Sequence, residues 1–351
     1  MDNWGIIGHE WAVHLLRHAL EAGELSHAYL FTGPPNVGKG TLARALAAAL
    51  FCSEDERPCG NCRSCRLVAS GNHPDLFWVQ PESEAGRLKV EQVRELQHHL
   101  ALTPNMAAHR LAVLDRFDQA TPSAANALLK TLEEPPEFVI LILLAPDTDS
   151  LLPTIVSRCQ VIPLRPIPIP EIARALHTRW NVEPEKARLL AHLSGGRLGW
   201  AVRAATEPDL LRRRQQRIEE MVALLRAPLT DRFRYAAELA RDPEATQEAL
   251  ELWTGWWRDV LILATGAEGS QKEGESLLTH LDQRSQLEVF AARCSPAQVA
   301  ACLRAIRAAQ DHLRRNANVQ LTLEVLLGFD LPAKADAGGE IPPAPTSISP
   351  K

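Results

Sequence analysis

The chain of 351 residues is 46% hydrophobic and 23% charged, and its formal net charge is −5. This length predicts two or three globular domains, and the negative charge excludes a protein that coats nucleic acid through its overall field. Because no apolar run reaches the ~18 residues of a membrane span and Met1–Ala12 lacks a secretory signal, we expect a cytoplasmic protein.

Up to about residue 165, short apolar runs alternate with helical segments. Helices are expected to include Leu42–Phe51, Val90–Leu100 and Ala124–Glu133. Buried strands are expected between them, at Tyr29–Thr32, Leu76–Val79, Leu111–Leu114, Phe138–Leu144 and Gln160–Leu164. Several of these runs lack polar alternation, as parallel strands covered on both faces do. The pattern therefore predicts an α/β domain with a parallel sheet at residues 1–165.

A proline-rich stretch, Pro163–Pro170, ends this region. It carries four prolines, which neither a helix nor a central strand accepts, so we interpret it as a hinge. Helical segments then follow at Glu171–Arg179, at Pro184–Leu193 with Gly195 as a stop, and from about Leu210 to Gly328. We therefore expect a small helical domain at 166–205 and an all-helical domain at 206–330. Residues 331–351 are rich in Pro, Ala, Gly and Ser and are predicted to be disordered.

A glycine-rich loop follows the first expected strand, with the sequence Gly33-Pro-Pro-Asn-Val-Gly38-Lys39-Gly40-Thr41. Between a strand and a helix, such a loop is typical of a P-loop, whose backbone N–H groups and lysine bind phosphates. The alternative is a glycine-rich turn with a chance lysine. Gly40 stands where a Ser or Thr hydroxyl should hold Mg²⁺, and Thr41 is displaced by one residue, a rotation of about 100° on a helix. ATP can bind such a loop, but the usual ligand for Mg²⁺ is missing.

A second acidic position of P-loop proteins lies at the end of a later strand. Asp115 directly follows the expected strand Leu111–Leu114 and suits the metal-side carboxylate, although an ordinary strand-end Asp is the alternative. Arg116 comes next and cannot act as a general base. The sequence thus predicts a degenerate nucleotide site formed by Gly33, Gly38, Lys39, Thr41 and Asp115.

Several motifs closely resemble those of bacterial clamp-loader subunits, which are AAA+ proteins. The most specific are Ala-Asn-Ala-Leu-Leu-Lys-Thr-Leu-Glu-Glu-Pro-Pro at 125–136 and Leu-Leu-Pro-Thr-Ile-Val-Ser-Arg-Cys at 151–159. The opening, Ile7–Glu10 and Ser26–Phe31, and the end, Asn316–Leu321, are also similar to that family. The resemblance extends over roughly residues 1–330. It implies a helical lid at 166–205 and an oligomerisation collar at 206–330.

Within this family, gamma/tau subunits hydrolyse ATP and delta-prime subunits do not. Four departures favour the delta-prime type: Gly40, Arg116, Ala145 near the position of a polar sensor, and Trp200 near the position of the lid arginine. The alternative is a gamma/tau-like ATPase, which the presence of Lys39 would support.

The motif Ser157-Arg158-Cys159 is complete. The resemblance implies that Arg158 acts in trans, as an arginine finger on the ATP of a neighbouring subunit. The alternative is a surface arginine at the start of a strand.

Four of the seven cysteines lie within fourteen residues, at Cys52, Cys59, Cys62 and Cys65. Four thiolates suit a closed tetrahedral Zn²⁺ site with no open position, so the sequence predicts a structural zinc insert at 52–65. The alternative is a surface loop of reduced cysteines. His73 is a lesser candidate ligand.

The resemblance therefore implies a non-hydrolysing delta-prime subunit of the DNA polymerase III clamp loader, which helps load the sliding clamp on primer–template DNA. It implies gamma/tau and delta subunits as direct partners, primer–template DNA within the complex and the sliding clamp as an indirect partner. A second alternative is a zinc-module protein that binds nucleic acid by itself. The negative net charge opposes this alternative.

Overall fold

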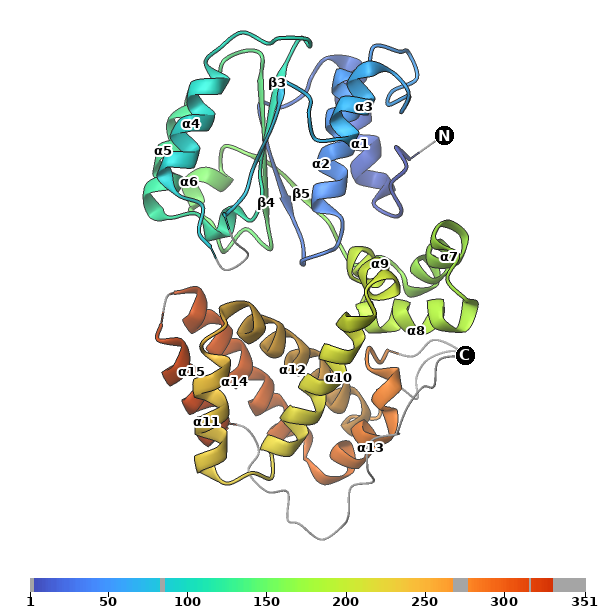
Figure 1. The fold of residues 1–351 in the computed structure, drawn as a ribbon, viewed down its shortest axis with the longest axis vertical. Helices are drawn as coiled ribbons and strands as arrows, with labels where there is room; N and C mark the ends of the chain where they lie inside the picture. The colour runs from blue at the N-terminus through green and yellow to red at the C-terminus, as the bar shows by residue number, and fades with distance from the viewer. Residues whose placement is uncertain (1–2, 83–85, 268–276, 316, 331–351) are drawn as a thin grey trace. The chain divides into compact units, whose positions relative to one another are not determined.

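The computed structural model describes residues 3–82, 86–267, 277–315 and 317–330 (Figure 1). The chain divides into two compact units, Met1–Val202 and Arg203–Lys351. The tail at 331–351, which the sequence predicts to be disordered, lies outside the described residues. Within the described ranges, none of the helices is long and apolar enough to cross a membrane.

The first unit is built on a five-stranded sheet in the order β2-β3-β4-β1-β5. Every pair of neighbouring strands is parallel, as the sequence predicts. The three inner strands are fully buried, which explains why they are apolar apart from Thr32 and Arg110 at their ends. The strands are β1 (Ala28–Thr32), β2 (Leu76–Val79), β3 (Arg110–Leu114), β4 (Val139–Ala145) and β5 (Gln160–Pro163).

Helices cover both faces of this sheet (Figure 1). Alternate residues of β4 point to opposite faces, so Ile140, Ile142 and Leu144 join the core beneath α1, α2 and α3. Leu141 and Leu143 join a second core beneath α4, α5 and α6. The helices are α1 (Glu10–Ala22), α2 (Lys39–Phe51), α3 (Arg63–Ala69), α4 (Val90–Leu100), α5 (Pro122–Glu133) and α6 (Pro153–Val156), with a 3₁₀ turn, η1 (Phe117–Gln119).

The expected elements match the observed ones closely, but several helices begin earlier than the apolar pattern indicates. Helix α5 begins at Pro122, whereas the periodicity starts it at Ala124. Proline suits the first helical turn because its missing N–H would have no partner there. The Thr121 hydroxyl accepts the Ala124 N–H at 3.2 Å and caps the same turn.

Two helices, α7 (Ile169–Trp180) and α8 (Pro184–Ser194), follow in the first unit. The next helix, α9 (Leu198–Thr206), contains the boundary between the two units. Gly195 ends α8 in the left-handed conformation, as the sequence predicts. The N–H of Ile167 donates to the carbonyl of Gly196 at 2.8 Å and fastens the proline-rich stretch to this turn. The start of α9 lies directly after the turn.

The second unit is helical in its described part. Its core holds Trp253, Trp256 and Trp257, all fully buried, around which the other helices pack. The elements are α10 (Pro208–Leu224), α11 (Leu229–Leu239), α12 (Pro243–Ala264), η3 (Leu281–Gln283), α13 (Arg284–Arg293), α14 (Pro296–Arg314), α15 (Val319–Val325) and a π-helical turn, η4 (Leu326–Asp330).

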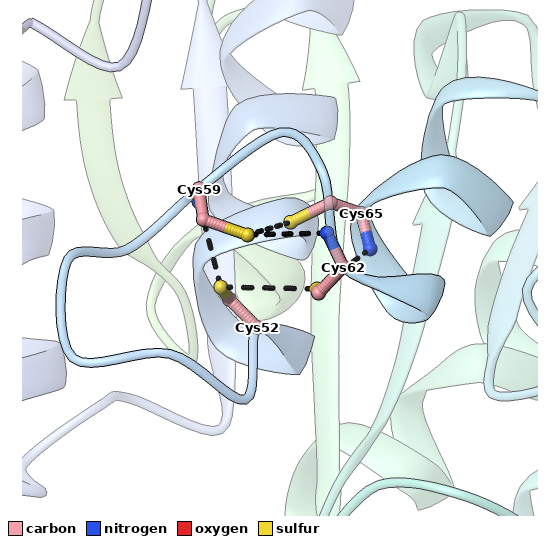
Figure 2. Close-up of side chains that lie close together, drawn as sticks. All are labelled: Cys52, Cys59, Cys62 and Cys65. Carbon is pink, nitrogen blue, oxygen red and sulfur yellow. Dashed lines mark hydrogen bonds between the residues drawn. The ribbon is translucent and has the colours of Figure 1, made fainter.

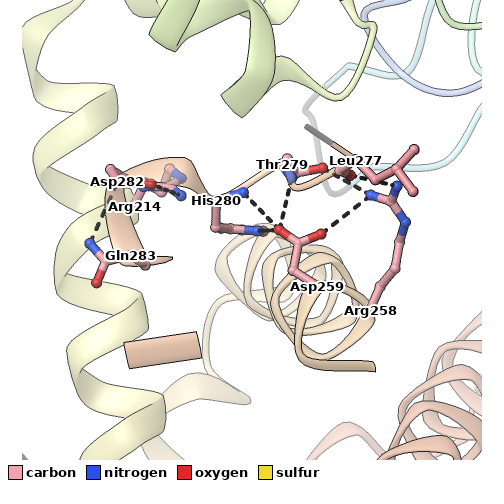
Figure 3. Close-up of polar contacts among 8 residues, drawn as sticks. All are labelled: Arg214, Arg258, Asp259, Leu277, Thr279, His280, Asp282 and Gln283. Carbon is pink, nitrogen blue, oxygen red and sulfur yellow. Dashed lines mark hydrogen bonds and ion pairs between the residues drawn. The ribbon is translucent and has the colours of Figure 1, made fainter. Parts of the chain in front are cut away.

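A buried polar network joins α12 to the segment before α13 (Figure 3). Asp259 Oδ2 accepts the backbone N–H groups of Thr279 and His280 at 2.9 and 2.7 Å, and His280 Nδ1 donates to it at 2.9 Å. Arg214 pairs with Asp282 at 2.6 Å beside them. The network fixes this segment on the helical core, because buried polar groups are costly without partners.

We expect the second unit to lose stability on acidification through His280. Burial lowers the pKa of His280 from its ordinary value, against the opposing hydrogen bond to Asp259. The charges of Arg214 and Asp282 also act on it, and Arg258 pairs with the other oxygen of Asp259. The folded state thus binds this proton less readily than the unfolded state. The stabilisation is complete above about pH 6.5 and decreases below it, by at most about 1.4 kcal/mol per pH unit. Denaturant titrations at several pH values should show a weaker acid dependence in His280→Gln than in the wild type; equal dependence would contradict this role.

Candidate functional site

The glycine-rich loop lies between the carboxyl end of β1 and the start of α2, as a P-loop requires. Gly33 and Gly38 have φ angles of 144° and 119°, a region that side chains rarely adopt. A Cβ atom on Gly33 would stand 2.4 Å from the Leu164 carbonyl oxygen. Both positions therefore require glycine.

Lys39 directly follows this loop and is the first residue of α2. Its Nζ donates to the carbonyl oxygens of Gly33 and Pro34 at 2.6 and 3.1 Å. Burial lowers the pKa of Lys39, while the charges of Asp115 and Asp118 act in the opposite direction. Burial also raises the pKa of Asp118, a neighbour that the sequence analysis did not place here. The lysine is thus hydrogen-bonded to two loop carbonyls and lies in the field of two carboxylates.

The position of the missing magnesium ligand is covered by other side chains. A Cβ atom on Gly40 would lie 3.5 Å from Trp78 of β2, in ordinary contact. The Arg44 guanidinium stacks over the same indole, 4.2 Å from its centroid. Thr41, the displaced hydroxyl, is exposed. The residues present do not fit the usual Mg²⁺ site of a P-loop, because Gly40 offers no oxygen and an indole and a cation flank it.

Asp115 follows β3, where the sequence predicts it. Its backbone N–H donates to the Val79 carbonyl at 2.8 Å, and its Oδ1 accepts the Arg116 N–H at 2.9 Å. Arg116 has a left-handed backbone, with φ 50°, and precedes η1. The position next to Asp115 therefore carries a cation where ATP hydrolysis would need a base.

The tip of the loop is fastened to its surroundings. The Asn36 carbonyl accepts the N–H of Gly199, in the first turn of α9, at 2.9 Å. His9 Nε2 donates to the Val37 carbonyl at 3.0 Å. A Cβ atom on Gly199 would lie 2.9 Å from the Asn36 oxygen, so the close approach requires glycine. No sequence motif indicated this contact.

Arg158 lies far from this loop. It follows α6 and precedes β5, whose Gln160 pairs with Tyr29 and whose Pro163 pairs with Thr32. Arg158 therefore lies beyond the amino end of these paired strands, and the P-loop lies beyond their carboxyl end, roughly 20 Å away along the strands. Helix α6 also covers the opposite face of the sheet from α2 (Figure 1). The arginine and the loop of the same chain are separated by the sheet.

The Arg158 side chain is half-buried and has fixed partners. Its Nη2 pairs with Glu133 Oε1 at 2.7 Å, and its Nη1 donates to the Thr154 carbonyl at 2.8 Å. In the sequence, Glu133 marks only the end of an expected helix. Only the packing of α5 against α6 brings these two positions together.

The four predicted cysteines form one cluster after α2 (Figure 2). Their sulfur atoms all lie within 4.8 Å of one another, and the pairs Cys59–Cys65 and Cys52–Cys62 are 4.0 Å apart. Four sulfurs at about 2.3 Å from one ion would be separated by similar distances, so the donor set and its spacing fit a tetrahedral metal site. The cluster can hold a metal ion.

Backbone N–H groups point at these sulfurs. Cys59, Cys62 and Cys65 donate to the sulfurs of Cys52, Cys59 and Cys62 respectively, at 3.3–3.4 Å. The Cys65 N–H lowers the pKa of Cys62 to about 6, whereas burial raises the pKa of Cys65 to about 12. The first effect favours the thiolate that metals bind.

His73, the lesser candidate ligand, lies outside the cluster. Its ring stacks on Phe51 with centroids 4.2 Å apart, and its Nδ1 accepts the Asp75 N–H at 3.2 Å. The histidine is buried, and burial lowers its pKa. It supports the turn around Pro74 from within.

Known proteins resemble the chain along most of its length. A family model described as DNA polymerase III, delta subunit, matches residues 8–168. The DNA polymerase III subunit delta' of Bacillus subtilis is 32% identical over 322 residues, which cover 89% of this chain and 93% of that protein. Subunit delta' of Pseudomonas aeruginosa is 41% identical over 182 residues, 49% of this chain and 53% of the relative.

Two further matches are weaker, one in the share of the relative that is covered and the other in sequence identity. The DNA polymerase III subunit tau of Escherichia coli is 35% identical over 200 residues, 55% of this chain and 31% of tau. The solved Holliday junction branch migration motor RuvB of Thermotoga maritima is 17% identical, with a TM-score of 0.42, over 92% of this chain and 89% of that one. Because the Bacillus relative matches nearly the whole of both sequences, the chain belongs to the delta-prime family of DNA polymerase III clamp-loader subunits.

Proposed function

We propose that this clamp-loader subunit does not turn over ATP and supplies Arg158 to the nucleotide of a neighbouring subunit. The observation that carries the proposal is the position of Arg158, which lies beyond the opposite end of the sheet from the P-loop of its own chain. A guanidinium there has no phosphate to serve within the chain. A neighbour that presents its nucleotide at this edge would give it one.

Two features of the subunit's own candidate nucleotide site support the absence of turnover. Phosphoryl transfer needs a positioned divalent ion and a group that orients the attacking water. Gly40 provides no oxygen for the ion and lies against Trp78, and Arg116 stands beside Asp115 in place of a base. Lys39 and the loop N–H groups remain able to bind phosphates weakly.

The purified subunit is therefore expected to show no ATP hydrolysis above background. Phosphate release would be measured with Mg²⁺ and ATP, with and without primer–template DNA, for the wild type and Lys39→Ala. Both should give the same background rate. A steady rate that Lys39→Ala abolishes would favour the gamma/tau-like ATPase, the alternative that Lys39 and Asp115 support.

The partners follow from the family. We place gamma/tau and delta subunits next to this chain, primer–template DNA within the assembled loader, and the sliding clamp as the object that is loaded. Residues 166–205 would act as the lid and 206–330 as the collar that assembles with other subunits. The loader would work in the cytoplasm, on replicating DNA.

Zinc is the ion that best suits the cysteine cluster. Four cysteine thiolates without an open position are the usual ligands of structural zinc, so Cys52, Cys59, Cys62 and Cys65 would hold it. The bound ion would cross-link the end of α2 to the start of α3, which lie on the same face of the sheet. It would take no part in phosphate chemistry.

A further inference from the structure

Glu133, a carboxylate at the end of α5, binds Arg158, the arginine that we propose acts on the nucleotide of a neighbouring subunit. Glu133 Oε1 lies 2.7 Å from Arg158 Nη2. The Thr154 carbonyl accepts from Nη1 at 2.8 Å, and the Ser157 hydroxyl lies 3.4 Å from the same nitrogen. We infer that Glu133 is a positioning residue for Arg158, an inference that rests on the proposed role of Arg158 in trans.

The backbone on both sides of this ion pair is firmly packed. Leu132, next to Glu133, and Ile155 of α6 are buried in the same apolar core. The carboxylate and the Thr154 carbonyl are therefore held in fixed places by α5 and α6. The side chains themselves remain accessible, with 50% of Glu133 and 35% of Arg158 exposed. A partner subunit can reach the arginine without any change in the core.

The geometry of a guanidinium explains how the contacts with Glu133 and Thr154 orient Arg158. The group is planar and has five N–H donors, and an arginine side chain otherwise samples many rotamers. Two of its nitrogens are bound here from two directions, which fixes the plane and leaves other N–H groups for a phosphate. A charged group that is already oriented loses less freedom when the reaction needs it. Glu133 would thus raise the rate at the neighbour's site without touching its nucleotide.

The next residue supplies a matched control. Glu134 is also exposed and differs from Glu133 by one position, but its backbone already ends α5, with its N–H on the Lys130 carbonyl. Adjacent helical residues face in different directions. Glu134→Gln removes the same charge from the same helix end, and it leaves the ion pair with Arg158 in place.

The test uses the complete reconstituted loader and measures DNA-stimulated ATP hydrolysis over a range of ATP concentrations. Glu133→Gln is expected to lower kcat about two- to five-fold with little change in KM, since orientation and not nucleotide affinity is affected. Glu134→Gln should match the wild type. In the Arg158→Ala background, Glu133→Gln should cause no further loss, because the group that it orients is gone.

Other outcomes would contradict either the positioning role of Glu133 or the proposed function of Arg158. An unchanged or higher kcat in Glu133→Gln, or equal losses in Glu133→Gln and Glu134→Gln, would overturn the positioning role. A loss that adds to that of Arg158→Ala would also overturn it, because Glu133 would then act elsewhere. If Arg158→Ala itself hydrolyses ATP at the wild-type rate, the proposed function fails instead.

Discussion

Replacing Cys62 with Ser is expected to release the metal from the cysteine cluster and to destabilise the first unit. Cys62 contributes its sulfur to the cluster, and it also begins α3, accepting the Cys65 N–H at 3.4 Å. Three remaining thiolates bind zinc far more weakly, and structural zinc contributes directly to folding. We expect the bound zinc to fall from one per chain to less than about a tenth, with a loss of stability on the order of several kcal/mol.

A second cysteine provides the control for this experiment. Cys159 lies outside the cluster, and burial raises its pKa to about 12, so it is an inert thiol. The Cys159→Ser variant should retain one zinc per chain in the cysteine cluster. Elemental analysis and thermal unfolding of both variants would be compared with the wild type. Zinc far below one per chain in wild-type protein purified without chelators would contradict the site, as would full occupancy in Cys62→Ser.

Acidification should also release zinc from the wild-type cluster. Protons compete with the metal for each thiolate, so zinc affinity should decrease as the pH falls. The N–H groups aimed at the sulfurs lower the pKa of Cys62 to about 6, whereas burial raises the pKa of Cys65 to about 12, so the two thiols oppose each other in this dependence.

Arg158→Ala is expected to impair the assembled loader and leave the subunit itself intact. The side chain is partly exposed, and exposed ion pairs such as that with Glu133 contribute about 0–1 kcal/mol to stability. Folding, zinc content and assembly should therefore be unchanged. An arginine finger can contribute about 10³–10⁵ in rate at the site that it serves. The loss for the whole loader should be partial, because its other sites keep their own fingers.

Arg158→Lys tests the chemistry of the side chain. Lysine retains the charge but lacks the planar fork of donors, so we expect poor rescue. Lysine also cannot bind Glu133 and the Thr154 carbonyl in the same geometry. Clamp loading and ATP hydrolysis would be measured together. Full activity of the lysine variant would show that charge alone is sufficient.

Much of the first unit could be predicted because its signals are local in the sequence. The inner strands are largely apolar runs, and β2 and α4 have the bounds that the pattern predicts. The cysteine spacing indicated a metal site, and the four sulfurs do converge. Local signals also have limits, since the start of α5 at Pro122 depends on capping by Thr121 and not on apolar periodicity.

Contacts between distant segments could not be predicted in this way. Trp78 meets Gly40 because its side chain lies on the face of the sheet that α2 covers, and no motif records this neighbour. Glu133 meets Arg158 because α5 packs on α6. Such pairs depend on strand order and on the face that each helix covers, which only the folded chain determines.

The central claim is that this subunit contributes an arginine to its neighbour and no working ATP site of its own. Two variants of this chain, Arg158→Ala and Lys39→Ala, test it most directly when each is assembled with wild-type partners and assayed for DNA-stimulated ATP hydrolysis. We predict that Arg158→Ala lowers the rate several-fold and that Lys39→Ala leaves it at the wild-type level. The reverse pattern, a loss with Lys39→Ala and none with Arg158→Ala, would contradict the claim.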